Sequence, residues 1–241
     1  MNILLLGYGK MGKVIEQTAL SRGHQIVGKI DVNNRAELIN FTTENVDVAI
    51  EFSAPEAAYL NLKWAMNAGI ATVCGTTGWL QHRPEIEHLC QQNNSAFFYA
   101  SNYSIGVNLF FRLNAYLAKL VAPYESQYEV SMTEIHHTEK LDAPSGTAIT
   151  LAEGMLANFA TKKTWINQAQ AAENELPIVS LREGKVPGTH VVRYDSAVDT
   201  LEIQHIAHSR DGFALGAVVA AEWLKNKKGT FGMEEMLGSA I

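Results

Sequence analysis

The chain is poor in cysteine and proline, and its share of charged residues is low. Its two cysteines, Cys74 and Cys90, lack metal-ligand spacing, so we expect both to be reduced and structural. Charged residues make up 18% of the 241 residues and the net charge is −6, which argues against a nucleic-acid partner or an anionic-membrane surface. No run approaches about 18 consecutive apolar residues, and no cleavage-like site follows the start. We therefore expect a cytoplasmic protein without a transmembrane helix or a removable targeting peptide.

Hydrophobic residues make up 47% of the chain, enough for one large or two modest cores. In the first hundred residues, short apolar runs alternate with helical patterns. Strands are predicted at 2–7, 25–31, 47–52, 71–74 and 96–100, and helices at 13–21, 56–67 and 85–92. This alternation is typical of an α/β fold with a Rossmann-like, doubly wound parallel sheet.

After residue 104 the pattern changes. Helices are predicted at 107–120, 147–159, 213–224 and 234–237, and strands at 127–137, 178–182, 190–194 and 200–207. The last two strands are predicted to form a hairpin near Ser196 and Asp199, and the polar stretch 161–175 to be a surface excursion. Helices beside such strands indicate a smaller α+β domain with a mixed sheet.

A glycine-rich loop follows the first predicted strand. Gly7-Tyr-Gly-Lys-Met-Gly12 matches G-x-G-x-x-G in its required strand–turn–helix context. Gly7 permits the tight turn, Gly9 lets the backbone approach a pyrophosphate, and Gly12 allows the helix to pack closely. Asp31 ends the second predicted strand and can accept hydrogen bonds from ribose hydroxyls, although an ordinary strand-end acid is the alternative for this residue alone. The loop predicts dinucleotide binding.

Loops at the carboxyl ends of the parallel strands are the expected ligand-binding positions in such a sheet. Three of them hold small, polar, turn-forming residues suited to the nicotinamide-ribose half, and only their shared edge favours binding over an ordinary loop. The predicted cofactor-binding set is Gly7, Gly9, Lys10, Met11, Gly12, Asp31, Phe52, Ser53, Gly75, Thr76, Thr77, Ser101, Asn102 and Tyr103.

The choice between NADH and NADPH depends on Asp31. An ionised carboxylate about 4 Å from a 2′-phosphate opposes it by up to roughly 4 kcal/mol per charge pair at an effective dielectric near 20. NADH is therefore the preferred cofactor, while Lys10 and Arg35 can offset the repulsion and allow NADPH.

A second chemical signal is a histidine pair in the strand predicted at 127–137. Side chains alternate between the faces of a strand, so His136 and His137 point apart and at most one of them faces a given site. His136 shares its face with Glu134, Met132 and Val130.

The helix predicted after this strand begins at a potential anion cradle. Ser145 is the expected N-cap, and the N–H groups of Gly146 and Thr147 lie at the positive end of the helix dipole. Lys140 can add a full positive charge for a carboxylate or phosphate. The alternative is a plain helix cap beside a solvated lysine, but the neighbouring histidines favour a site.

We expect no metal site. His205 and His208 lie three apart on a predicted strand and its exit, so they point to different faces. His190 and Arg210 are instead expected to help line a substrate pocket, while His205 is either packed or hydrogen-bonded.

These motifs closely resemble those of the 4-hydroxy-tetrahydrodipicolinate reductase (dihydrodipicolinate reductase) family. The resemblance runs from residue 2 to near the C-terminus and is specific beyond a generic Rossmann match. It is carried by the Gly7 loop, Gly75-Thr-Thr-Gly78, Glu134-Ile-His-His137, Lys140, Asp142-Ala-Pro-Ser-Gly-Thr-Ala148, Arg182-Glu-Gly184 and Gly188-Thr-His190.

The resemblance implies a function and a role for several residues. It implies NAD(P)H-dependent reduction of a cyclic dicarboxylate in diaminopimelate and lysine biosynthesis, with hydride from nicotinamide and a proton from His136. Lys140 matches the catalytic cation, His137 a substrate-contacting position, and Ser145, Gly146 and Thr147 the carboxylate cradle.

The same resemblance implies how the chain is organised. Residues 1–104 plus 211–241 would form the dinucleotide-binding domain, and 105–210 a substrate-binding domain whose sheets associate into a homotetramer. Two departures from the family pattern, the short loop after Gly7 and Val32 in place of a basic residue, weigh against NADPH.

Two other functions share part of this pattern. Another NAD(P)-dependent amino-acid or semialdehyde dehydrogenase would have the glycine loop without the combination of paired histidines and Ser-Gly-Thr. A nicotinamide-sensing binding module would leave His136 and Lys140 without a role.

Overall fold

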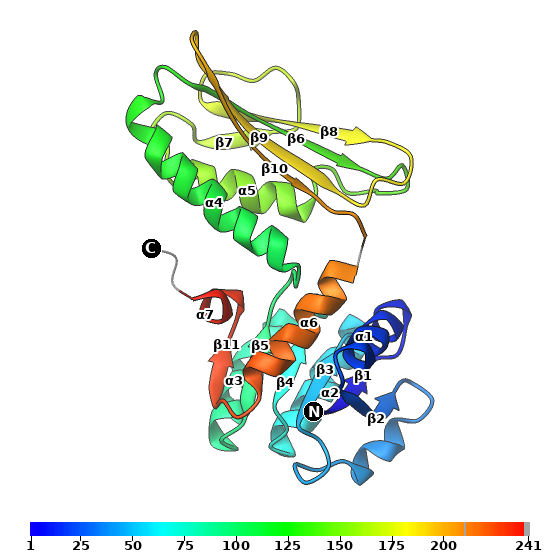
Figure 1. Ribbon diagram of the computed structural model, residues 1–241. Helices are drawn as coiled ribbons and strands as arrows, with labels where there is room; N and C mark the ends of the chain where they lie inside the picture. Colours follow the sequence, from blue (N-terminus) through cyan, green and yellow to red (C-terminus); the bar gives the residue numbers. More distant parts are fainter. Residues whose placement is uncertain (210, 239–241) are drawn as a thin grey trace. The chain divides into compact units, whose positions relative to one another are not determined.

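The computed structural model describes residues 1–209 and 211–238, which divide into two compact units (Figure 1). Unit 1 contains Met1–Ile105 and Asp211–Ile241, and unit 2 contains Gly106–Arg210. The C-terminal part of the chain thus returns to the unit formed by the first hundred residues.

Unit 1 is built on a six-stranded parallel sheet with the order β11-β5-β4-β3-β1-β2. The predicted doubly wound parallel sheet is therefore confirmed. The direction of winding reverses between β1 and β3, which is where such sheets bind ligands. The strands are β1 (Asn2–Leu6), β2 (Gln25–Ile30), β3 (Val48–Glu51), β4 (Thr72–Cys74), β5 (Ala96–Tyr99) and β11 (Gly229–Phe231).

Helices cover both faces of this sheet, as Figure 1 shows. One core cluster joins α1 (Lys10–Ser21) and α6 (Asp211–Leu224) to one face, and a second joins α2 (Pro55–Asn67) and α3 (Arg83–Gln92) to the other. Because both faces are covered, the central strands are buried along their length and mostly apolar instead of alternating. Short elements complete the unit: η1 (Arg35–Asn40), η2 (Leu80–His82) and α7 (Met233–Leu237).

Unit 2 is built on a five-stranded mixed sheet with the order β10-β9-β6-β8-β7. Its central strand β6 pairs antiparallel with β9 and parallel with β8, which confirms the predicted mixed sheet. Two helices pack on one face of it. The elements are α4 (Ile105–Val121), η3 (Ala122–Tyr124), β6 (Glu129–His136), α5 (Gly146–Leu156), β7 (Thr164–Ile166), β8 (Glu175–Arg182), β9 (Thr189–Asp195) and β10 (Thr200–Ile206).

Two edge strands are absent from the sequence-based prediction. β7 lies within 161–175, which was wrongly predicted to be a surface excursion, and β11 follows α6, where no strand was predicted. Both strands have three residues and one neighbour in the sheet, so their short patterns carry too little periodicity to identify them. Helix α5 also ends at Leu156 instead of 159.

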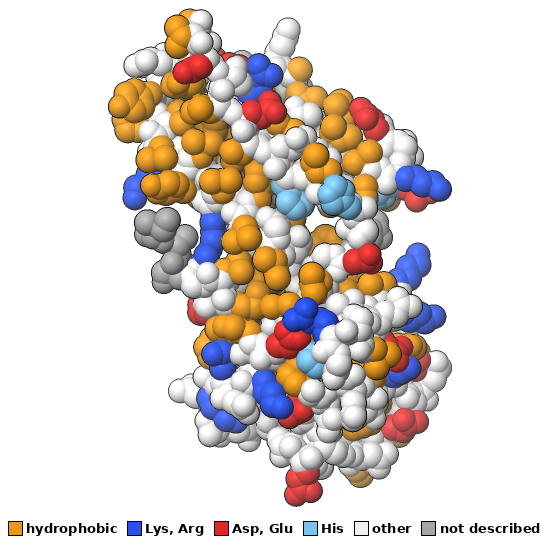
Figure 2. Space-filling model, in the orientation of Figure 1, with side chains coloured by type: hydrophobic (Ala, Val, Ile, Leu, Met, Phe, Trp, Pro, Cys, Tyr) orange, Lys and Arg blue, Asp and Glu red, His pale blue; other side chains and the backbone are white. Residues whose placement is uncertain are grey.

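Helix α4 carries an exposed apolar stripe. Leu109, Leu113, Tyr116 and Leu120 are each about half exposed and recur at helical spacing. Hydrophobic side chains gather over this helix on the face drawn in Figure 2. The segment Ile105–Tyr124 is long and apolar enough to cross a membrane by length and composition, a test that core helices of other proteins also pass.

Helix α6 packs closely because its buried face consists mainly of alanine and glycine. At Gly216 an added Cβ would overlap the carbonyl oxygen of Tyr103, whereas at Gly212 it would meet only Ser104 Oγ at 3.7 Å. The helix therefore needs a glycine at position 216 but not at position 212.

We expect Gly216→Ala to lower the free energy of unfolding by about 3 kcal/mol, because the methyl group forces α6 away from the backbone it contacts. Gly212→Ala is the matched control and should change stability by less than about 1 kcal/mol. Urea unfolding followed by circular dichroism measures both. Equal losses for the two variants would contradict the close approach at Gly216.

Candidate active site

The candidate site begins on strand β6. Glu134 and His136 lie on its buried face, with Glu134 fully buried and His136 only 7% exposed. His137 follows the end of the strand and is partly exposed. This difference in burial is in line with the prediction that the two histidines point apart.

The carboxylate of Glu134 is held by groups from three other segments. The N–H of Ser145 donates to both carboxylate oxygens at 3.1 Å, and Arg182 Nη2 donates to Oε1 at 3.3 Å. His190 Nε2 lies 3.8 Å from Oε2. Burial alone would raise the pKa of Glu134, but the adjacent imidazole of His136 and the donors of Ser145 outweigh it and hold the pKa well below its usual range. Glu134 is therefore an anion.

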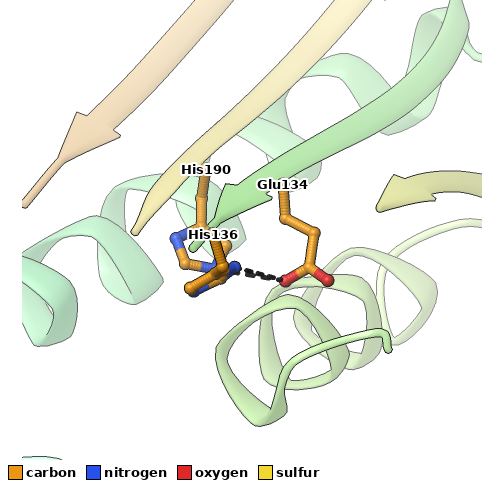
Figure 3. A group of neighbouring side chains, drawn as sticks. All are labelled: Glu134, His136 and His190. Carbon is orange, nitrogen blue, oxygen red and sulfur yellow. Dashed lines mark ion pairs between the residues drawn. The ribbon is translucent and has the colours of Figure 1, made fainter. Parts of the chain in front are cut away.

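His136 faces this anion (Figure 3). Its Nδ1 lies 3.3 Å from Glu134 Oε2, at ion-pair distance but off the alignment of a hydrogen bond. Nδ1 is buried and has no other partner among the described residues. Nε2 on the other side of the ring lies 3.0 Å from where a Cβ on Gly188 would be, so a side chain there would crowd the imidazole.

His190 completes the group from strand β9. Its ring meets that of His136 edge-to-face, with centroids 5.1 Å apart. Burial, together with the neighbouring His136, lowers the pKa of His190 to about 4, so this imidazole is neutral at pH 7. Its Nε2 lies 3.1 Å from Ser145 Oγ.

Arg182 connects Glu134 to the loop that follows β6. Its Nη2 donates to the carbonyl oxygen of Asp142 at 2.7 Å, and its Nε donates to that of Lys140 at 3.3 Å. The side chain of Lys140 pairs with Asp142, with Nζ 2.8 Å from both carboxylate oxygens. The predicted cation thus sits on a partly exposed loop with its backbone fixed by Arg182.

The start of α5, predicted to be an anion cradle, has the expected N-cap and one unexpected feature. Ser145 is the N-cap and its Oγ accepts from the N–H of Ala148 at 3.2 Å, as expected. Its own N–H is directed to Glu134 and the residue is 2% exposed, so it faces inward. Gly146 is exposed and Thr147 partly exposed at the helix N-terminus.

In unit 1 the three glycines of the first loop take distinct environments. Gly7 has a φ of +98° and donates to the carbonyl oxygen of Ile30 at 2.8 Å, while a Cβ on it would overlap the backbone of Phe52. A Cβ on Gly12 would lie 2.5 Å from the carbonyl oxygen of Gly7. A Cβ on Gly9 would meet nothing within 4 Å, so this side of its backbone is open to a ligand.

The neighbouring loops meet this one at the carboxyl edge of the sheet. The N–H of Ser53 donates to Thr76 Oγ1 at 2.9 Å, and the ring of Phe52 lies over Gly75. Tyr103 is 2% exposed and its hydroxyl donates to the carbonyl oxygen of Cys74, which places it in the core. The remaining predicted residues, Lys10, Met11, Thr77, Ser101 and Asn102, are exposed or partly exposed.

The residues that bear on cofactor choice are also placed. Asp31 is exposed, and its Oδ1 accepts from the N–H of Asn33 at 2.7 Å. Arg35 donates to Asn61 Oδ1, and Asn61 in turn lies 3.4 Å from the buried carboxylate of Glu51. The fold thus keeps the acid at the surface and ties the arginine to α2.

Glu134, His136 and His190 are also the one group within the described ranges whose potential metal ligands lie within 4.8 Å of one another. Of the other histidines considered, His205 contacts the Phe110 ring and His208 is exposed. Arg210 lies outside the described residues.

Sequence reasoning missed Glu134, Arg182 and Gly188 as site residues. A signal existed for Glu134, because it lies two positions before His136 and so shares its strand face. No local pattern connects Arg182 or Gly188 to β6, since their contacts arise from strand pairing far along the chain.

Known proteins of one family match nearly the whole length of this chain. Residues 1–103 match the model of the dihydrodipicolinate reductase N-terminus, and residues 106–237 that of its C-terminus. The chain is 49% identical to a 4-hydroxy-tetrahydrodipicolinate reductase of Christiangramia forsetii over 98% of both chains, and 32% identical to one of Methanosarcina barkeri over 99% of both. The fold is shared with a dipicolinate-bound dihydrodipicolinate reductase from a Paenisporosarcina species, with a TM-score of 0.76 at 22% identity, covering 98% of this chain and 99% of that one.

The pKa of His190 predicts how stability depends on pH. Because the folded-state pKa of about 4 lies below the ordinary value of 6.5, unfolding takes up a proton between these values, and stability falls as the pH is lowered through them. The loss should reach roughly 3 kcal/mol, and Glu134 adds to it only below its ordinary pKa of 4.5.

Urea unfolding of the protein and of His190→Gln across this range tests the prediction. The variant should show a flatter dependence on pH, whereas His88→Gln, which changes an exposed histidine, should follow the unaltered protein. Parallel curves for all three proteins would mean that His190 titrates normally.

Proposed function

The chain belongs to the dihydrodipicolinate reductase family, and from this premise we propose which of its residues carry the reduction of 4-hydroxy-tetrahydrodipicolinate. The reaction is the NAD(P)H-dependent reduction of this compound in diaminopimelate and lysine biosynthesis. The observation that carries the assignment is the match of both halves of the chain to the two family models. It favours this function over another amino-acid or semialdehyde dehydrogenase and over a nicotinamide-sensing module.

We assign the general acid to His136. Reduced nicotinamide, when bound, supplies the hydride, and a proton must reach the substrate ring as electrons move. An imidazole is suited to this step because its reference pKa lies near the operating pH. The buried carboxylate of Glu134 lies 3.3 Å from His136 Nδ1 and offers a counter-charge to the ring, which supports the assignment.

Lys140 and the start of α5 are assigned to the substrate carboxylates. The ion pair of Lys140 with Asp142 is partly exposed, and pairs of this kind contribute only about 0–1 kcal/mol. A dianionic substrate can therefore take the place of Asp142 on the ammonium group. Gly146 and Thr147 offer N–H groups at the helix N-terminus, and His137 is assigned to substrate contact.

The dinucleotide is assigned to unit 1 and the substrate to unit 2. The open backbone at Gly9 and the close approach of Gly7 to Phe52 support a pyrophosphate cradle at the switch between β1 and β3. NADH is the proposed preference, because Asp31 is exposed at the end of β2 and Arg35 is tied to Asn61.

The proposal extends to a cytoplasmic homotetramer formed through unit 2. The sheet face opposite α4 and α5 carries apolar side chains that are only partly covered within the chain, including Ile135, Val179, Leu181 and Val191. Exposed apolar surface of this kind is typical of subunit interfaces.

We expect His136→Gln to lower kcat by about 100-fold or more, because glutamine cannot donate a proton as an acid, with little change in cofactor affinity. Lys140→Ala should instead lower kcat and raise the KM for the dicarboxylate. Steady-state kinetics with freshly prepared substrate measures both. Near-normal turnover in His136→Gln would remove the acid assignment.

Cofactor preference is a separate prediction. The protein should have a higher kcat/KM for NADH than for NADPH, and Asp31→Asn should narrow the difference by about tenfold or more because it removes the charge that opposes the 2′-phosphate. Asn33→Ala is the control, since it alters the same turn without changing the charge. A strong NADPH preference in the unaltered protein would contradict the role given to Asp31.

A further inference from the structure

We propose that Glu134 is the positioning residue of His136: it holds the imidazole with Nδ1–H toward its carboxylate, so that Nε2 is the atom that delivers the proton. The inference rests on the proposed function and adds to it a residue and a specific nitrogen atom. It follows from four observations on unit 2.

The first observation is that the backbone fixes both residues. Glu134 and His136 lie two apart on β6. This strand pairs with β8 at both residues and with β9 at Glu134 and the residue after it. The two side chains therefore leave the sheet on the same face, next to each other. Their relative position is set by the sheet and not by a mobile loop.

The second observation is that the carboxylate cannot rotate away. The N–H of Ser145 contacts both of its oxygens at 3.1 Å, and Arg182 contacts Oε1 at 3.3 Å. Oε2, which accepts from Ser145, also lies 3.3 Å from His136 Nδ1. A carboxylate held by these hydrogen bonds has a fixed position and can orient the imidazole of His136.

The third observation is that Nδ1 has no other acceptor. It is buried and unpartnered within the part of the chain that the structure describes, so a proton on Nδ1 can be satisfied only by Glu134. The present contact, at 3.3 Å, is off hydrogen-bond alignment. Catalytic hydrogen bonds are often poorly aligned before the substrate binds.

The fourth observation concerns the opposite side of the ring. Nε2 lies against Gly188, where the absent side chain leaves room beside it. The charged and titratable groups around the ring are Glu134 on β6, Arg182 on β8 and His190 on β9, and His190 is neutral at pH 7. Among the described residues, Glu134 is the carboxylate at ion-pair distance from the ring, and it lies at Nδ1.

A metal ion held by Glu134, His136 and His190 is the competing explanation for the same geometry. The carboxylate already accepts hydrogen bonds from Arg182 and Ser145, and the guanidinium opposes a second cation nearby. We therefore expect activity to survive dialysis against a chelator. Loss of activity that zinc restores would overturn the positioning role.

The kinetic test uses two substitutions of Glu134. Glu134→Gln keeps the size of the side chain but removes the charge, so kcat should fall about 100-fold while the KM values for cofactor and dicarboxylate change by less than about threefold. Glu134→Asp keeps the charge and should recover part of the loss. Ser131→Ala, on the opposite face of β6, is the control and should leave kcat unchanged.

The spectroscopic test reads the tautomer directly. In ¹⁵N-histidine spectra, with the signal of His136 identified by its absence in His136→Gln, the neutral ring should carry its proton on Nδ1. In Glu134→Gln that signal should shift toward the other tautomer, and thermal melting shows whether each variant is folded. If Glu134→Gln is unfolded, Glu134→Asp carries the test, with the tautomer retained and kcat above that of His136→Gln.

The results separate this inference from the proposed function. If His136→Gln loses turnover while folded Glu134→Gln retains both turnover and the Nδ1–H signal, the positioning role is wrong and the acid assignment stands. An Nε2–H signal in the unaltered protein also overturns the positioning role. If His136→Gln itself retains turnover, the acid assignment fails first.

Discussion

The buried charge of Glu134 is the constraint on which unit 2 depends. Removing a carboxylate from water costs several kcal/mol unless hydrogen bonds and opposite charge replace its hydration. Here the replacement comes from Arg182 on β8, the N–H of Ser145 at the start of α5, and the imidazole of His136 on the same strand. Satisfying one anion thus fixes a strand pairing, a helix N-terminus and the ring proposed as the acid.

Sequence reasoning succeeded where the physics is local. The apolar run before Gly7 predicted β1 and its loop, and the period-two pattern of β6 predicted that His136 and His137 lie on different sides. Ser145 was identified as a helix cap because capping depends on residues within one turn. Each of these features is decided by neighbours a few positions away.

Features that depend on distant parts of the chain could not be predicted in this way. The contact of Arg182 with Glu134 joins residues 48 positions apart, and the position of α6 on the first sheet depends on Gly216 meeting the backbone of Tyr103. Edge strands β7 and β11 are defined by the strand each pairs with, because three residues have no reliable period. The later loops were assigned to the cofactor from their position alone, so the predicted set included Tyr103, which the structure places in the core.

The arrangement separates groups that must stay fixed from groups that must exchange partners. Arg182 holds the loop after β6 through two carbonyl oxygens, and this backbone anchoring does not involve the side chains of Lys140 and Asp142. Those side chains pair with each other in a partly solvated position, where the pair is weak enough to be replaced by a substrate carboxylate. The buried anion cannot be exchanged in this way, because removing any one donor leaves a charge without hydration. The position of His136 is therefore rigid because the carboxylate of Glu134 is buried. The side chain of Lys140 can change partners because its ion pair with Asp142 is partly exposed to water.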